Sequence, residues 1–219
     1  MRKPIIAGNW KLFKTQLEAA DFVSSLKPLV ANQQNVEIVI APVFTALAAS
    51  AQAMQGSNIR LAAQDCFWEE GGAFTGEVSP GLLKDVGCSH VIIGHSERRQ
   101  YFGETDETVN KKTKAAIAQG LVVLLCVGES LAEREAGDTF KVIEGQIKGG
   151  LVGISSAELD KLVVAYEPVW AIGTGKTASD EQAQEVHSFI RKLVSELYRQ
   201  ADADKLRILY GGSVKPENA

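Results

Sequence analysis

Residues 121–127 read LVVLLCV, an unbroken apolar run that is far too short to cross a bilayer. Similar runs recur along the chain at residues 4–7, 36–41, 59–63, 90–93, 162–165 and 206–210. Each run is continuously apolar and does not alternate with polar residues, which is typical of strands buried on both faces of a parallel sheet covered by helices. The seven runs therefore predict seven parallel strands.

Segments with helical periodicity lie between these runs. The clearest is residues 179–199, which begins with a capping box formed by Ser179 and Gln182. A second predicted helix, from residue 105 or 106 to 119, is followed by Gly120, a residue type that ends helices. We expect further helices at residues 17–30, 45–54, 80–86 and 139–149.

Strand and helix alternate with a repeat of roughly 30 residues and without a low-complexity linker, which predicts one α/β domain over residues 1–219. Two architectures fit, an open doubly wound sheet and a closed (β/α)8 barrel. The first strand is not followed by GxGxxG, which argues against the dinucleotide-binding form of the open sheet. Polar residues follow the apolar runs, as active-site residues do at the carboxyl ends of barrel strands: Asn9, Lys11, Gln64, Asp65, His95, Glu97, Glu129, Glu167 and Ser213. This placement favours the barrel.

The composition argues against several classes of protein. A formal net charge of -4 is unfavourable for binding a nucleic-acid backbone, and the N-terminus does not have the pattern of a signal peptide. Cys66, Cys88 and Cys126 each lie in or beside an apolar run, which predicts buried thiols and a reducing compartment, the cytoplasm. The sequence has no CxxC, HExxH, EF-hand or Walker motif, so we expect no metal and chemistry that depends on side chains alone.

The strongest functional signal is AYEPVWAIGTGK at residues 165–176. Glu167 directly follows a predicted buried strand, where partial desolvation makes a carboxylate a better base near neutral pH. The backbone of Gly173, Thr174 and Gly175 can turn N–H groups toward an anion, and Pro168 at one end with Lys176 to Ala178 at the other can act as hinges of a lid. The alternative is an idle glycine-rich surface loop, on which an exposed Trp170 would be unusual.

HVIIGHSERR, residues 90–99, contains two histidines with different expected roles. His90 opens a strand and is expected to be structural. His95 precedes a predicted helix start at Ser96 and Glu97, where the helix dipole disfavours a second proton on the ring. A neutral imidazole at this position can donate to a carbonyl oxygen and shuttle a proton. His187 lies within a predicted helix, and we expect it to be a surface or packing residue.

Two further motifs lie at the ends of the chain. Lys11 would be an ordinary surface lysine elsewhere, but two residues beyond a barrel strand it can offset negative charge on a phosphate or an enediolate. Asn9 is placed to orient Lys11 or to bind a substrate oxygen. In YGGSV, residues 210–214, two glycines allow the backbone to approach a phosphate, which barrels often bind after the seventh strand.

Together these motifs closely resemble the triosephosphate isomerase family, because AGNWK (residues 7–11), HSERR (95–99), AYEPVWAIGTGK and YGGSV occur in its order. The resemblance spans the whole chain. It implies the (β/α)8 fold, no cofactor, and the interconversion of dihydroxyacetone phosphate and D-glyceraldehyde 3-phosphate. It also implies that Glu167 removes the carbon-bound proton, that His95 transfers protons between the two enediol oxygens, and that Lys11 with Asn9 stabilises negative charge.

The resemblance also implies binding roles. Gly173 and Ser213 would hold the phosphate, Tyr210 would latch the closed lid near Ala178, and Glu97 would be a supporting acid beside Lys11 and His95. The family is dimeric, and residues 66–79 look like its protruding third loop, with Thr75 reaching the neighbouring site. A long loop that carries Trp68 and Phe74 is difficult to explain on a monomer.

The resemblance stops at Ala219, before the family's eighth strand and helix. The sequence therefore predicts a fragment with about seven βα units, truncated after the seventh strand and either poorly active alone or completed by a separate piece. The alternative function is a non-catalytic partner for the folding or assembly of such a C-terminal piece. A different phosphate-binding barrel enzyme is a third hypothesis, and the complete lid motif argues against it.

Overall fold

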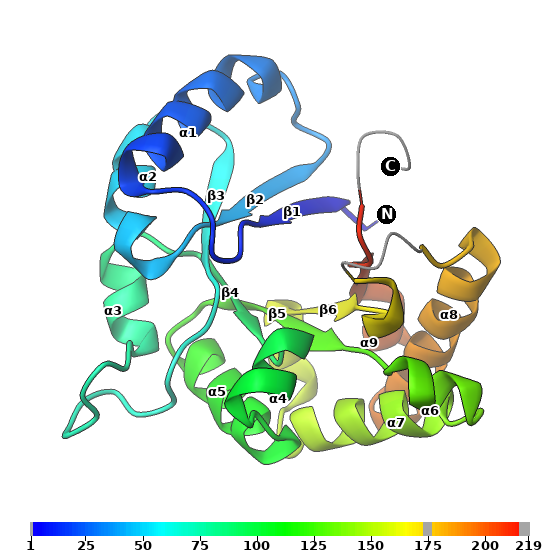
Figure 1. Cartoon of the computed structure of the whole chain (residues 1–219). Helices are drawn as coiled ribbons and strands as arrows, with labels where there is room; N and C mark the ends of the chain where they lie inside the picture. Colours follow the sequence, from blue (N-terminus) through cyan, green and yellow to red (C-terminus); the bar gives the residue numbers. More distant parts are fainter. Residues whose placement is uncertain (1, 173–176, 215–219) are drawn as a thin grey trace. The chain divides into compact units, whose positions relative to one another are not determined.

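The computed structural model describes residues 2–172 and 177–214. Within these residues strands and helices alternate along the chain (Figure 1). The strands are β1 (Ile5–Asn9), β2 (Glu37–Ala41), β3 (Ile59–Ala63), β4 (His90–Ile93), β5 (Val122–Val127), β6 (Leu162–Tyr166) and β7 (Arg207–Tyr210). Each predicted apolar run thus forms a strand, and the prediction of an α/β chain is confirmed.

The chain forms two compact units, each described here by itself. The first contains residues 1–93 and 111–124, and the second contains residues 94–110 and 125–219. The strands follow one another in the sheet in the order of the chain, with β5 contributing residues to both units. In the first unit β1 pairs with β2 and β2 with β3, both in parallel, and in the second unit β6 pairs in parallel with β7. The prediction of one domain stays a prediction.

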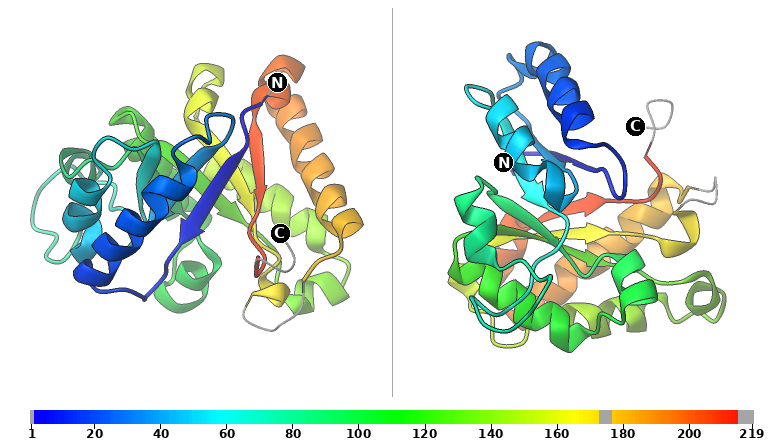
Figure 2. Two further views of the ribbon diagram at one scale, coloured as in Figure 1. Left: turned by 90° about the horizontal axis from the view of Figure 1, so that it is seen from above. Right: turned by 60° about the vertical axis from the view of Figure 1, so that its left-hand side comes forward.

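The first unit contains α1 (Gln16–Val30), the short helix η1 (Phe44–Ala46), α2 (Leu47–Ala53) and α3 (Pro80–Asp85). α1 begins at Thr15, whose side chain forms a capping box with Glu18, and α1 packs against α2 (Figure 2). The single helix predicted at residues 45–54 is divided in the structure into η1 and α2. α5 (Asp106–Ala118) ends before Gly120, whose φ of 78° is the left-handed conformation expected of a helix-ending glycine.

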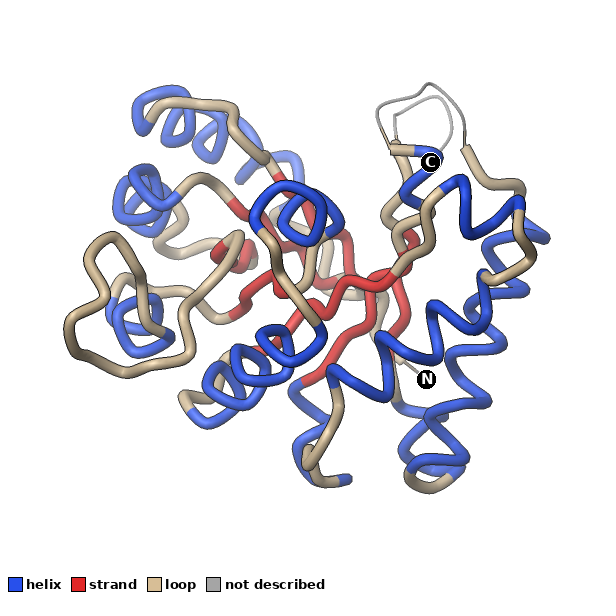
Figure 3. Tube along the Cα trace, turned by 60° about the horizontal axis from the view of Figure 1, so that its bottom comes forward, coloured by secondary structure: helices blue, strands red, loops and turns tan. Residues whose placement is uncertain are grey.

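The second unit contains α4 (Ser96–Phe102), α6 (Leu131–Glu135), α7 (Thr139–Gly150), α8 (Asp180–Leu197) and α9 (Gln200–Lys205), with the short helices η2 (Ser156–Lys161) and η3 (Val169–Ala171). The predicted capping box of Ser179 and Gln182 is present at the start of α8. α8 packs against α7 and α9, and helices lie outside the strands (Figure 3). The helices α6 and α9 were not predicted, because LAERE and QADADK lack an apolar stripe.

The strands supply most of the core. Almost every residue of β2 to β6 is buried, as continuous apolar runs predict, whereas β1 and β7 are partly exposed. The core side chains include Ile93, Leu125 and Val164, which are completely buried. Within residues 2–172 and 177–214, no helix combines the length and the apolar character needed to cross a membrane.

Candidate active site

His95 occupies the junction between β4 and α4 and is the N-cap residue of α4. Its Nδ1 atom accepts a hydrogen bond of 3.2 Å from the backbone N–H of Glu97. A backbone N–H can only donate, so Nδ1 carries no proton and a neutral ring carries its proton on Nε2. The hydrogen bond at the helix start fits an imidazole with its proton on Nε2, and the role of His95 as a proton shuttle stays a prediction.

Glu167 is the first residue after β6, and its backbone N–H donates to the carbonyl oxygen of Val127 at 2.8 Å. Its Oε1 atom lies 3.2 Å from Nε2 of His95, and its Oε2 atom accepts a hydrogen bond of 3.1 Å from the backbone N–H of Ser96. Only 6% of Glu167 and 7% of His95 are exposed. The structure thus brings the predicted base and the predicted proton shuttle into direct contact, in a site with little access to water.

Glu129 supports the segment that follows Glu167. Its side chain is completely buried, and its Oε1 atom accepts hydrogen bonds from Trp170 Nε1 (2.9 Å), Tyr166 OH (3.1 Å) and Arg134 Nη1 (2.9 Å). Burial and the adjacent carboxylate raise the pKa of Tyr166, so its hydroxyl remains a donor. The end of β5 therefore fixes the residues on both sides of Glu167. The sequence placed Glu129 after a strand but gave no sign of these three donors.

The segment after β7 lies against the segment after β6. Tyr210 OH accepts a hydrogen bond of 3.0 Å from the backbone N–H of Ala178. Ser213 has a φ of 48°, and its hydroxyl donates to the carbonyl oxygen of Ala171 at 2.7 Å. The structure thus joins Tyr210 to Ala178, the two residues expected to form a latch. The predicted phosphate-loop residues Gly173, Thr174, Gly175 and Lys176 lie outside the described residues.

Lys11 and Asn9 lie at the end of β1 in the first unit. The Lys11 backbone N–H donates to Asn9 Oδ1 at 3.0 Å, and its carbonyl oxygen accepts from Gln64 Nε2 at 2.9 Å. These two bonds hold Lys11 in the left-handed region, at a φ of 51°. Asn9 therefore contacts the Lys11 backbone, and both roles predicted for it, orienting Lys11 and binding a substrate oxygen, stay predictions. That Lys11 meets His95 and Glu167 stays a prediction.

Sequence relatives identify the family. Residues 4–219 match the family model described as triosephosphate isomerase. This chain belongs to the triosephosphate isomerase family. The triosephosphate isomerases of Trichlorobacter lovleyi and Geobacter metallireducens are 70% and 69% identical over 218 residues, covering 100% of this chain and 87% of each relative. That of Moorella thermoacetica is 59% identical over the same length, with the same coverage. The family's fold class is the (β/α)8 barrel, so the preference for the barrel over the open sheet is confirmed.

Glu97 and Thr75 complete the residues that the resemblance to triosephosphate isomerases singled out. Glu97 Oε2 lies 3.6 Å from His95 Nδ1, and the Glu97 side chain is 38% exposed. Thr75 is exposed on the loop between β3 and α3, where the rings of Phe67 and Phe74 contact each other at a tilt of 48°, with their centroids 4.8 Å apart. Its predicted contact with a second subunit stays a prediction.

Gly128 is a residue of the site that the sequence did not reveal. It follows β5, its N–H donates to Gln146 Oε1 at 2.8 Å, and its carbonyl oxygen accepts from Gln146 Nε2 at 3.1 Å. A methyl group on Gly128 would lie 1.8 Å from the Glu167 carbonyl oxygen. The ends of β5 and β6 are so close that only glycine fits at position 128. No local pattern in a triosephosphate isomerase sequence predicts a contact between residues as far apart in the chain as Gly128 and Glu167.

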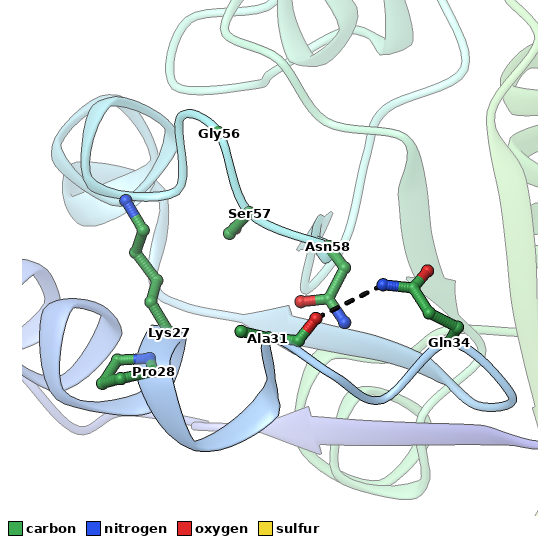
Figure 4. A pocket seen from close by; sticks show the side chains of 7 residues that line it. All are labelled: Lys27, Pro28, Ala31, Gln34, Gly56, Ser57 and Asn58. Carbon is green, nitrogen blue, oxygen red and sulfur yellow. Dashed lines mark hydrogen bonds between the residues drawn. The ribbon is translucent and has the colours of Figure 1, made fainter.

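A cavity of about 500 Å³ lies elsewhere in this triosephosphate isomerase family member, in the first unit (Figure 4). It is lined by Lys27, Pro28, Ala31, Gln34, Gly56, Ser57 and Asn58. Several of its polar groups are bonded to the backbone, including Gln34 Nε2 to the Ala31 carbonyl oxygen at 3.3 Å and Lys27 Nζ to that of Gln55 at 2.9 Å. These bonds close the end of α1 and bring no catalytic groups together.

The three cysteines are buried and form no disulfide in the described part of this chain, in agreement with the predicted buried thiols. Burial raises the pKa of Cys88 to about 12. Burial and the neighbouring Glu167 charge raise the pKa of Cys126 well above its ordinary value, so this thiol stays protonated beside the site. In residues 2–172 and 177–214 no group of three or more His, Cys, Asp or Glu residues could hold a metal ion.

Proposed function

We propose that this chain is a triose-phosphate isomerase, which interconverts dihydroxyacetone phosphate and D-glyceraldehyde 3-phosphate without a cofactor. Membership of the family supports the reaction, and one contact supports the chemistry. The Glu167 carboxylate lies 3.2 Å from Nε2 of His95, whose other ring nitrogen accepts from a backbone N–H. A buried base and a neutral proton donor therefore lie side by side.

The proposed reaction moves a proton between two adjacent carbons. Glu167 removes the proton from the carbon next to the carbonyl group, while the Nε2–H of His95 donates to the carbonyl oxygen, giving an enediol or enediolate. His95 Nε2 then takes a proton from the hydroxyl oxygen on the neighbouring carbon, which becomes the new carbonyl oxygen, and Glu167 delivers its proton to the carbon that carried the first carbonyl group. The Nε2–H that meets Glu167 in the structure turns to the substrate oxygen when substrate is bound. Lys11 and Asn9 stabilise the charge on the enediolate, with Glu97 as a supporting acid.

The proposed phosphate site and lid involve the segments that follow β6 and β7. Gly173 and Ser213 bind the phosphate, and Pro168, Trp170, Thr174, Gly175, Lys176 and Ala178 belong to the lid. The hydrogen bond from the Ala178 N–H to Tyr210 OH supports the latch. Exclusion of water by the closed lid protects the enediolate from losing its phosphate group.

The proposed assembly is a homodimer in the cytoplasm, with Thr75 in contact with the neighbouring subunit. The loop that carries Thr75 supports this assembly, because Phe74 on it is 43% exposed. The three buried cysteines without a disulfide support a reducing compartment. Size-exclusion chromatography with light scattering tests the assembly, and a monomeric mass at micromolar concentration would contradict it.

A coupled enzymatic assay tests the proposed reaction. We expect Glu167→Gln and His95→Ala to lower kcat/KM by at least about 1,000-fold, because each removes a group that transfers a proton in the transition state. Glu196→Gln, which changes an exposed helix carboxylate of the same unit, should keep the wild-type rate. Near-normal turnover by a folded Glu167→Gln variant would reject the assignment.

A further inference from the structure

The backbone of Gly94, immediately before His95, is held by charged side chains on both sides of its Cα atom. Its N–H donates to Glu104 Oε2 at 3.0 Å, and its carbonyl oxygen accepts from Arg99 Nε at 3.0 Å. The Glu104 side chain is only 2% exposed and the Arg99 side chain 19%. Hydrogen bonds to ionised groups are stronger than those between neutral groups, so the backbone at Gly94 is fixed more firmly than an ordinary strand end.

The space around Gly94 leaves little room for a side chain. Its φ of 77° lies in the left-handed region. A methyl group there would lie 3.2 Å from the Cys126 carbonyl oxygen, 3.2 Å from Val109 Cγ2 and 3.3 Å from Arg99 Nη2. Close packing around Gly94 and the hydrogen bonds with Glu104 and Arg99 therefore fix the backbone that leads into His95.

Arg99 connects this peptide to the rest of the second unit. Its Nη1 atom lies 2.6 Å from Asp106 Oδ1 in the first turn of α5. Its own backbone N–H donates to the His95 carbonyl oxygen at 3.1 Å, one helical turn away. Arg99 therefore binds the carbonyl oxygens of two consecutive residues, Gly94 through its side chain and His95 through its backbone.

We infer that Arg99 is a positioning residue for His95. Its guanidinium fixes the Gly94 peptide, which sets the direction in which the imidazole leaves the backbone and hence the 3.2 Å contact of Nε2 with Glu167. Arg99 acts through Gly94 and touches no reacting atom. The inference rests on the proposed isomerase function, in which a misplacement of about 1 Å costs up to about 100-fold in rate.

The substitutions Arg99→Met and Arg99→Lys remove different parts of this arrangement. Methionine keeps the aliphatic stem but donates to neither Gly94 nor Asp106. Lysine keeps the charge, but its point-like ammonium cannot reproduce the fork that serves both partners. Arg191→Met is the matched control, because Arg191 also donates its guanidinium to backbone carbonyl oxygens of the same unit, those of Ala203 and of Leu206 (3.0 Å), neither of which is a proposed catalytic residue.

The experiment measures kcat and KM for the four proteins and the ¹⁵N resonances of the His95 ring. We expect kcat to fall about 10- to 100-fold in Arg99→Met and less in Arg99→Lys, with KM changed less than about 3-fold. The His95 ring resonances should move in both variants. Arg191→Met should melt at a lower temperature with kcat and the ring resonances unchanged.

A folded Arg99→Met protein with wild-type kcat and wild-type ring resonances would overturn the inference, as would an equal effect of Arg191→Met. If Arg99→Met does not fold, Arg99→Lys decides by the same two readings. Absence of turnover in the wild-type chain would reject the proposed function, and the ring resonances of the variants would still decide whether Arg99 positions His95.

Discussion

Replacing Gly128 by alanine is the most direct way to disturb Glu167 without changing its side chain. The added Cβ would lie 1.8 Å from the Glu167 carbonyl oxygen and 2.7 Å from its carbonyl carbon. Non-bonded heavy atoms need more than about 3 Å, so the two segments must separate by at least about 1 Å. Gln146 binds both the N–H and the carbonyl oxygen of Gly128, so much of this displacement should fall on Glu167.

We expect Gly128→Ala to lower kcat by about 100-fold, because a displacement of about 1 Å is enough to misplace a catalytic group. The overpacking should also destabilise the chain by about 1–3 kcal/mol. Steady-state assays and urea denaturation measure the two effects separately.

Gly145→Ala is the matched control for Gly128→Ala. Gly145 is an exposed residue inside α7, and a methyl group there meets no atom within 4 Å. This substitution should stabilise the chain by about 0.5–1 kcal/mol, because alanine loses less conformational entropy than glycine in a helix, and it should leave kcat unchanged. The reasoning is wrong if folded Gly128→Ala keeps kcat within about 3-fold of the wild type.

Three further predictions concern stability. Lys112→Met removes an ammonium that lies 2.7 Å from the buried Asp65 carboxylate, and it should lower the free energy of unfolding, measured by urea denaturation, by about 3 kcal/mol. Lys148→Met, in a half-exposed pair with Glu144, should lower it by about 0.5 kcal/mol or less. Equal losses in the two variants would contradict the role of burial. The Arg199 guanidinium holds the pKa of Asp202 below its ordinary value, so the wild type should be more stable than Asp202→Asn at pH 7. This difference in stability should disappear as the pH falls through the lowered pKa, and a difference independent of pH would refute the linkage. Burial lowers the pKa of His187 below 6.5, so the wild type should lose stability as the pH falls below 6.5 and His187→Phe should lose less, as denaturation at several pH values would show; parallel curves would argue against it.

The strands and the long helices could be predicted because their signals are local. LVVLLCV became β5, with only its first residue left outside the strand, because a continuous apolar run is stable only where both faces are covered. The start of α8 was predicted because a capping box satisfies backbone N–H groups within four residues. The first strand was placed less well, since β1 extends through Gly8 and Asn9, whose pairing with β2 overrides their weak strand propensity.

The positions of Glu167 and His95 could be predicted for the same local reason, since each follows an apolar run. The residues that hold these two side chains and their neighbours in place could not be predicted. The buried acceptor Glu129 collects donors from Tyr166 and Trp170, residues far along the chain, and no sequence period reports such a convergence. The role of His187 was predicted only as surface or packing, and its edge-to-face contact with Tyr166 at 6.0 Å shows that packing is correct.

The two proposed catalytic residues share one structural principle. The backbone next to each is controlled by a glycine at a strand end whose N–H and carbonyl groups are both held by side chains: Gly94 by Glu104 and Arg99, and Gly128 by Gln146. A side chain cannot be placed more accurately than the backbone that carries it. The hydrogen bonds to the backbone therefore determine the 3.2 Å contact between Glu167 and His95 as much as the rotamers of the two side chains do. Substitutions of Glu104, Arg99 and Gln146 should therefore reduce kcat by more than the accompanying loss of stability would cause.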